Sequence, residues 1–258
     1  MRTRRALVTG GSRGIGRGIV LALSAAGHEV VAASRTVEGL EETVALAEAA
    51  GGARVAALAV DVGDLDASAA LPGLATEALG GHPDMLIHCA GIARPGRVTD
   101  LPLTDWEDSM RVNVTAAFVL AQAAAPAMSE AKWGRIINIG SLYSRVGAKH
   151  AAAYVASKHA LLGLTRVLSL ELVRDGITAN TIVPGFTDTE MVRGEARSVG
   201  AARGFDEEEA IRRFLRVQPL GRMVTTDEVG ALVAYLCSDA AAPITGQAIN
   251  IDGGALQS

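Results

Sequence analysis

Tyr154 and Lys158 are spaced so that both side chains can take part in one proton transfer. They lie four residues apart in a long Ala/Leu-rich segment, so a helix there places them on one face. A free tyrosine has a pKa of about 10, and a nearby ammonium lowers that pKa by stabilising the phenolate. Such a pair suits a general acid that protonates a carbonyl oxygen while hydride arrives at the carbon. The other tyrosines, Tyr143 and Tyr235, have no lysine at this spacing, and we expect Tyr235 to lie in the core.

Two further polar residues can complete such a site. Ser141 closes a predicted strand over residues 136–139, and a hydroxyl at that place can hydrogen-bond the substrate oxygen and orient it. Asn113 interrupts an apolar helical segment, where asparagine is unfavourable by itself. Beside the Tyr154–Lys158 pair, Asn113 is predicted to help hold a water molecule.

A glycine-rich loop directly follows the first predicted strand and opens a helix. It reads Thr9-Gly10-Gly11-Ser12-Arg13-Gly14-Ile15-Gly16. Its glycines let the backbone approach a pyrophosphate, and the helix N-terminus adds free N–H groups and partial positive charge. The spacing differs from GxGxxG, and Arg17-Gly18 after the last glycine excludes the Walker A loop of phosphate-binding NTPases. The loop therefore predicts a dinucleotide site.

The end of the second predicted strand indicates which dinucleotide is bound. An NAD site usually places an acidic residue there to bind the ribose 2′-hydroxyl, whereas this chain has Ser34-Arg35. Arg13 in the glycine loop is a second cation within reach. Because two guanidiniums can grip a 2′-phosphate bidentately, the sequence predicts NADP(H), as NADPH or NADP+, rather than NAD(H).

Short β-branched runs alternate along the chain with longer helical segments that must position these residues. The predicted strands are 6–9, 29–33, 55–60, 85–88, 135–139, 178–183 and 248–251, and the predicted helices are 15–26, 38–50, 65–79, 104–130, 153–174 and 226–238. This alternation predicts one α/β domain over residues 1–258, a doubly wound parallel sheet of about seven strands with helices on both faces. The rhythm breaks at about 187–224, where we expect a helical, lid-like insertion with a helix start at the acidic run 206–209.

Composition excludes several classes of protein. The net charge is −4 and aromatics make up 3% of 258 residues, which argues against a nucleic-acid-binding surface. Cys89 and Cys237 lie far apart with no metal-ligand spacing, so we expect buried thiols and no metal. No stretch approaches the ~18 apolar residues of a membrane span, and no signal-peptide core follows the basic start. A soluble cytoplasmic protein is therefore expected, without membrane or nucleic-acid partners.

Taken together, these motifs resemble the short-chain dehydrogenase/reductase family over the whole chain. The markers are Thr9-Gly10, Gly14-Ile15-Gly16, Asp61-Val62, Cys89-Ala90-Gly91, Asn113, Ser141, Tyr154, Lys158 and Pro184-Gly185. The resemblance implies a Rossmann-like fold and a catalytic tetrad. In it Tyr154 donates the proton, Ser141 orients the carbonyl, Lys158 lowers the tyrosine pKa and binds the nicotinamide ribose, and Asn113 supports a relay water.

The same resemblance implies the remaining dinucleotide contacts. Asp61 and Val62 would touch adenine, and Ala90 and Gly91 allow close approach to adenosine. The nicotinamide side would be lined by Ile182, Pro184, Gly185 and Thr187 or Thr189. The chain departs from the family where His88-Cys89 replaces the usual Asn-Asn, and we interpret His88 as a structural hydrogen-bonding residue.

The C-terminal segment 221–254 resembles the branch that contains 3-oxoacyl-thioester reductases. That branch also holds polyketide ketoreductases, hydroxyacyl-CoA dehydrogenases and sugar or steroid alcohol dehydrogenases. The implied activity is NADPH-dependent reduction of a ketone, most simply a 3-oxoacyl thioester, in a homotetramer. The alternatives are an NAD(P)-dependent secondary alcohol dehydrogenase and, remotely, a non-catalytic dinucleotide sensor.

The resemblance also bears on whether the acyl group arrives on a carrier protein or on CoA. Lys132 matches one basic carrier-docking position of the branch, whereas Asp175 stands at the other and argues against docking. Six lid arginines, 193, 197, 203, 212, 213 and 216, are candidates to meet a CoA phosphate or else form a solvated helix face.

Overall fold

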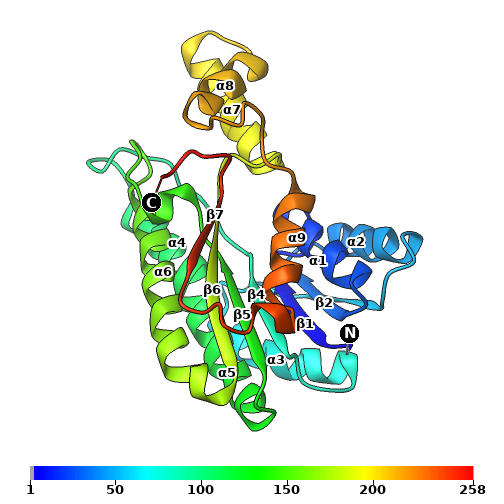
Figure 1. Ribbon diagram of the computed structural model, residues 1–258. Coiled ribbons are helices and arrows are strands. Elements are labelled where there is room, and N and C mark those ends of the chain that lie inside the picture. The colour runs from blue at the N-terminus through cyan, green and yellow to red at the C-terminus, as the bar shows by residue number, and fades with distance from the viewer. Residues whose placement is uncertain (1–2, 258) are drawn as a thin grey trace.

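A seven-stranded, wholly parallel sheet forms the centre of the protein in this computed structural model, which describes residues 3–257 (Figure 1). The strands are β1 (Arg5–Thr9), β2 (Glu29–Ser34), β3 (Val55–Ala59), β4 (Met85–His88), β5 (Gly134–Ile139), β6 (Ile177–Pro184) and β7 (Ala248–Ile251). Their spatial order is β3-β2-β1-β4-β5-β6-β7, so the chain reverses its direction of winding between β1 and β4. The predicted doubly wound sheet is confirmed, and ligands bind such sheets at this reversal.

Helices cover both faces of the sheet. They are α1 (Gly14–Ala25), α2 (Val37–Ala49), α3 (Leu65–Leu79), α4 (Leu103–Met110), α5 (Ala116–Glu130), α6 (Ala152–Leu172), α7 (Glu190–Arg203), α8 (Glu207–Phe214) and α9 (Thr226–Leu236). Successive side chains of β1 point to opposite faces of the sheet and belong to two separate hydrophobic cores. Val8 packs in one core with Ile19 and Val229, whereas Leu7 packs in the other with Leu71 and Leu120. Burial on both faces explains why the strands read as apolar runs without polar alternation.

The predicted helix over 104–130 is interrupted by a π-helical turn. The turn spans Arg111–Thr115, between α4 and α5, and holds Asn113. Taken across this turn, the helical stretch Leu103–Glu130 is long and apolar enough to cross a membrane, with a mean hydropathy of 1.3 over 18 residues, so the expectation that no stretch reaches this length was wrong. Here α4 packs against α6 and α5 packs against α3.

The expected insertion forms two helices above the carboxyl ends of the strands. In Figure 1, α7 and α8 stand at the top of the molecule, away from the sheet. Asp206 begins α8 by accepting a hydrogen bond from the Glu209 backbone N–H, at 2.8 Å, which confirms the predicted helix start. The base of the lid is tied by the buried Gln218, whose amide bonds the backbones of Phe186 and Arg222.

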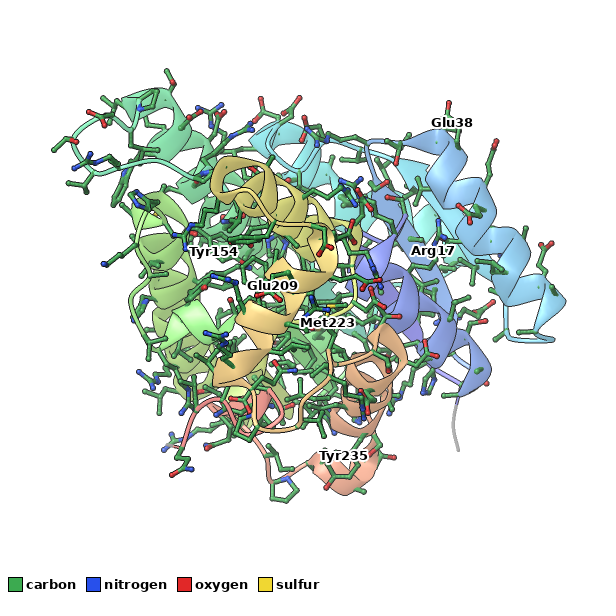
Figure 2. The ribbon with its side chains drawn as sticks, turned by 90° about the horizontal axis from the view of Figure 1, so that it is seen from above. Arg17, Glu38, Tyr154, Glu209, Met223 and Tyr235 are labelled. Atoms are coloured by element: carbon green, nitrogen blue, oxygen red, sulfur yellow. The ribbon has the colours of Figure 1, made fainter. Side chains whose placement is uncertain are left out.

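Tyr235 does not lie in the core. It is 48% exposed, because α9 turns Val229, Val233 and Leu236 toward the sheet and Tyr235 lies off that face (Figure 2). The prediction was wrong because aromatic character alone does not say which face of a helix a residue occupies.

Candidate active site

A cleft of about 300 Å³ opens at the carboxyl ends of the central strands, where β1 and β4 diverge. Most of the predicted cofactor-binding residues line it, namely Gly10, Ser12, Arg13, Gly14, Ile15, Gly16, Ser34, Arg35, Asp61, Val62, Cys89, Ala90, Gly91, Tyr154, Lys158 and Thr189. Within the described chain, Ile182, Pro184, Gly185 and Thr187 are not part of this lining, so their nicotinamide contacts stay predictions. The fold thus brings the glycine loop and the Tyr154–Lys158 pair, remote in sequence, to one cavity.

The glycine loop is shaped to receive an anion. Gly10 and Gly14 have φ of +71° and +54°, and a Cβ on Gly16 would collide with the carbonyl oxygen of Gly10. The N-cap of α1 is Arg13, whose side chain makes no capping hydrogen bond, and the first turn of α1 holds no acidic residue. The first N–H groups and the partial positive charge of α1 are therefore left for a ligand, which fits a pyrophosphate.

Two arginines of the cleft have no carboxylate partner among the described residues. Arg13 and Arg35 both line it, and neither forms an ion pair with any residue in 3–257. Arg17, by contrast, donates two hydrogen bonds to Glu42, at 2.9 and 2.7 Å, and is thereby neutralised. The two cations that the sequence singled out are the ones that remain free for a phosphate.

Thr9 and His88 connect the carboxyl ends of β1 and β4 by hydrogen bonds. The Thr9 hydroxyl accepts hydrogen bonds from the N–H groups of Cys89 and Ala90, both at 3.2 Å, so its own proton is directed to Nδ1 of His88, at 3.1 Å. Nε2 of His88 then donates to the carbonyl oxygen of Val112, at 3.2 Å. Burial lowers the pKa of His88 to about 3, and the interpretation of His88 as a structural residue agrees with this geometry.

Tyr154 lies on the first turn of α6 with its ring against Tyr143. The ring centroids are 6.2 Å apart and the planes meet nearly at right angles. Ser141 begins a short 3-10 helix, Leu142–Ser144, rather than ending β5, and its Oγ accepts a hydrogen bond from the Tyr143 backbone N–H. Burial raises the pKa of Tyr154 to about 12, outweighing a hydrogen bond from Ser141 that lowers it. The predicted lowering of this pKa is absent, because burial disfavours the charged phenolate more than the Ser141 hydrogen bond favours it.

Lys158 lies deep in the cleft, only 4% exposed. Its Nζ donates a hydrogen bond of 2.7 Å to the carbonyl oxygen of Ile139 and lies 5.6 Å from the centre of the Tyr154 ring. Burial lowers the pKa of Lys158 to about 8, and no carboxylate of the described chain pairs with it. An unpaired ammonium beside a phenol stabilises the phenolate that forms when the phenol gives up its proton.

Asn113 anchors the loop that follows β4. Its Oδ1 accepts from the Ile92 N–H at 2.8 Å, and its Nδ2 donates to the Ile92 carbonyl oxygen and to Ser157 Oγ, both at 2.9 Å. These bonds fill three of the four hydrogen-bonding positions of the amide. The site of a Cβ on Gly91 is 3.3 Å from Asn113 Oδ1 and 3.5 Å from Lys158 Nζ, so glycine there keeps the space between them open.

Some lining residues carry no sequence signal. The cleft is completed by Thr36, Val60, Ile92, Val112, Ile139, Gly140, Glu190 and Met191. Most are apolar residues next to predicted ones. Glu190 and Met191 come from the lid, whose position over the sheet could not be read from spacing. Figure 2, seen from above, shows the lid over the middle of the molecule, with Tyr154 labelled next to it.

Comparisons with known proteins agree with this geometry. A family model described as enoyl-(acyl carrier protein) reductase matches residues 10–255. The chain is 36% identical to D-beta-hydroxybutyrate dehydrogenase of Cupriavidus necator, covering 97% of both chains. It is also 36% identical to 3-oxoacyl-(acyl-carrier-protein) reductase of Pseudomonas aeruginosa, covering 96% of both.

A solved structure extends the likeness to three dimensions. An actinorhodin polyketide ketoreductase variant with NADPH superimposes with a TM-score of 0.92 at 36% identity, covering 98% of this chain and 97% of the other. With the glycine loop, the reversal of the sheet at β1 and β4 and the Tyr154–Lys158 pair in one cleft, the chain belongs to the short-chain dehydrogenase/reductase family, as an oxidoreductase that uses a nicotinamide dinucleotide and acts on CH–OH or C=O groups.

Proposed function

We propose that this enzyme uses NADPH to reduce a ketone to a secondary alcohol, with a 3-oxoacyl thioester as substrate. One observation carries the proposal. A single cleft is lined both by an uncapped helix N-terminus with two unpaired arginines and by Tyr154 with Lys158. Arg13 and Arg35 are suited to the 2′-phosphate that distinguishes NADPH from NADH.

The catalytic roles follow from the protonation states of the site. The bound dinucleotide supplies the hydride. Tyr154, with a pKa of about 12, holds its proton at neutral pH and donates it from Oη to the carbonyl oxygen. The Ser141 hydroxyl orients that oxygen. Lys158, with a pKa of about 8, is mostly an ammonium at neutral pH and stabilises the tyrosinate that is left.

The pairing of Lys132 favours a substrate whose acyl group is carried by CoA or another small thiol over one carried by a carrier protein. Lys132, the candidate docking cation, pairs with Asp175 at 2.6 Å, so it offers little charge to an acidic partner. The lid arginines Arg193 and Arg197, two of the candidates to meet a CoA phosphate, are also paired with carboxylates, so they offer little charge to that phosphate. Relatives named 3-oxoacyl-(acyl-carrier-protein) reductase and ketoacyl reductase support the 3-oxoacyl part of the proposal.

A second candidate function runs in the opposite direction. The likeness to D-beta-hydroxybutyrate dehydrogenases supports NAD(P)-dependent oxidation of a secondary alcohol, which the same tyrosine and lysine could serve in reverse. The arginines at the 2′-phosphate position favour the reductive, NADPH-dependent reading.

Assembly and location are part of the same proposal. We propose a homotetramer, supported by an uncovered apolar stripe on α6, where Val167 is 50% exposed and Leu170 79%.

A cytoplasmic location is supported by two free cysteines, Cys89 and Cys237, whose pKa values burial raises to about 12.

The cofactor assignment is tested by steady-state kinetics on the purified enzyme. We expect kcat/KM with NADPH to exceed that with NADH by at least about tenfold, and Arg35→Ala to lower the NADPH value by about 10- to 100-fold, as losing a charged hydrogen bond does. Arg54→Ala, at an exposed arginine before β3, is the control and should change neither value. A wild-type preference for NADH would refute the assignment. A panel of acetoacetyl-CoA, a carrier-bound analogue, a bicyclic ketone and a sugar ketone identifies the substrate class.

A further inference from the structure

Ser157 lies in the middle of a buried chain of hydrogen bonds beside the Tyr154–Lys158 pair. Its hydroxyl donates to the carbonyl oxygen of Tyr154 at 2.8 Å and accepts from Nδ2 of Asn113 at 2.9 Å. Ser157 and Asn113 are both 0% exposed. Because an amide nitrogen can only donate, the proton of the serine must point to Tyr154, so both bonds have a fixed direction.

The other end of the Asn113 amide is bonded to a wall of the cleft. Its Oδ1 accepts from the N–H of Ile92 at 2.8 Å and its Nδ2 donates to the Ile92 carbonyl oxygen at 2.9 Å, so Asn113 pairs with both backbone groups of that residue. Ile92 lines the cleft, and so does Tyr154. The chain of bonds therefore joins two walls of one cleft, the loop after β4 and the first turn of α6.

The start of α6 depends on bonds to other elements. Its N-cap residue is Ala151, whose methyl group cannot accept a hydrogen bond, and Tyr154 is only the third residue of the helix. Helix ends fray, and an end that lacks a cap does so more readily. Two adjacent side chains fasten this part of α6 to its surroundings. Lys158 donates to the Ile139 carbonyl oxygen of β5 at 2.7 Å, and Ser157 holds Asn113.

We propose that Ser157 is a positioning residue for the proton transfer. Through Asn113 it holds the first turn of α6 against the loop that carries Ile92, and it thereby fixes the place of the Tyr154 hydroxyl in the cleft. Positioning matters because a displacement of about 1 Å at a reacting group can cost about 100-fold in rate. The inference rests on the acid role of Tyr154 in the proposed function and adds a residue that serves this role without touching the substrate.

Ser157→Ala and Ser169→Ala form a matched pair of variants on the same helix. Ser169 is also buried and donates the same kind of bond, to the carbonyl oxygen of Arg166 three residues earlier, at 2.7 Å. No side chain among residues 3–257 donates to Ser169. Each variant loses one bond within α6, and only Ser157→Ala also releases Asn113. A difference between the two variants therefore reports the bond to Asn113 rather than the stability of the helix.

Turnover and NADPH binding are measured on both variants of the full-length enzyme. We expect Ser157→Ala to lower kcat on acetoacetyl-CoA about tenfold. Its NADPH Kd should stay within about threefold of wild type, because Ser157 is not among the described residues that line the cleft. Ser169→Ala should change neither quantity by more than about twofold.

Hydrogen exchange tests the bond to the cleft wall without turnover. Exchange in peptides that contain Ile92, followed by mass spectrometry, should be at least about fivefold faster in Ser157→Ala than in wild type, because release of Asn113 loosens its hold on the Ile92 N–H. Ser169→Ala should exchange like wild type in the same peptides.

Three results overturn the inference: Ser157→Ala keeps a kcat within about twofold of wild type, its kcat and its NADPH affinity fall in parallel, or exchange at Ile92 does not change. Failure of the proposed function is visible in the wild type instead. If wild type oxidises secondary alcohols and reduces no ketone, the proposed direction is wrong, and the same comparison of variants is made on alcohol oxidation. If wild type has no turnover in either direction, the proposed function is refuted and exchange at Ile92 alone decides whether Ser157 holds the cleft wall.

Discussion

At the scale of single residues, burial sets the charge of each ionisable group in the cleft. It keeps His88 neutral, keeps the proton on Tyr154, and lowers the pKa of Lys158 to about 8. The reductive direction needs the tyrosine and the lysine protonated together, and they are so at neutral pH. As the pH rises through about 8, Lys158 loses the charge that stabilises the tyrosinate.

His88 predicts a pH dependence of stability. Its pKa is about 3 in the folded protein against an ordinary value of 6.5, so between these values the unfolded chain binds the proton more tightly. Stability is therefore lost as the pH falls below 6.5, by about 2 kcal/mol at about pH 5. His88→Asn removes this contribution. The free energy of unfolding, measured with urea, should therefore fall less for the variant than for wild type between about pH 7 and pH 5. Parallel losses in the two proteins would contradict the account.

The identities of the catalytic candidates could be predicted from sequence, but their pKa values could not. Tyr154 and Lys158 are four residues apart on one helix, so local spacing was enough to pair them. The burial that raises the tyrosine pKa is a product of tertiary packing, which the local spacing of residues does not reveal.

At the scale of elements, the turn from β1 into α1 is the part of the cleft with the least steric tolerance. A Cβ on Gly16 would collide with the Gly10 carbonyl oxygen, so Gly16→Ala must displace the loop that faces the pyrophosphate. We expect its NADPH Kd to rise at least about tenfold and its Tm to fall.

The matched control for that variant is Gly73→Ala within α3, where an added Cβ meets no atom within 4 Å. It should bind NADPH normally and gain up to about 1 kcal/mol of stability, because alanine favours a helix over glycine. Fluorescence titration and thermal unfolding measure both effects. Normal NADPH binding by Gly16→Ala would count against a phosphate-binding role for the loop.

Strands and helices were predicted well because their apolar runs and glycine boundaries are local signals. The π-helical turn at Arg111–Thr115 was not, since the bonds that hold Asn113 go to Ile92 and Ser157, 21 and 44 residues away. The lid was predicted as helical from its composition. Its ion pairs, such as Arg193 with Glu207, join two helices whose mutual placement no short-range pattern reveals.

At the scale of the whole molecule, the doubly wound sheet brings residues from the entire chain together at one edge. The outer face of α6, with Val167 and Leu170, stays exposed to solvent. If that face joins copies of the chain, Leu170→Glu should break the assembly, because a buried unpaired charge is costly. Sedimentation should then show a tetramer for wild type and smaller species for Leu170→Glu. Val37→Glu, a half-exposed site on α2, should remain tetrameric. A tetramer that survives Leu170→Glu would rule out this face.

The central claim is that Tyr154 donates the proton to a ketone that NADPH reduces. It is tested most directly by Tyr154→Phe, which removes one hydroxyl and keeps the ring against Tyr143, with NADPH oxidation and NADPH Kd measured on the same samples. The account predicts that kcat on acetoacetyl-CoA falls by about 10³-fold while the Kd stays within about twofold of wild type, whereas Tyr143→Phe keeps most of its activity. Turnover by Tyr154→Phe within about tenfold of wild type would contradict it.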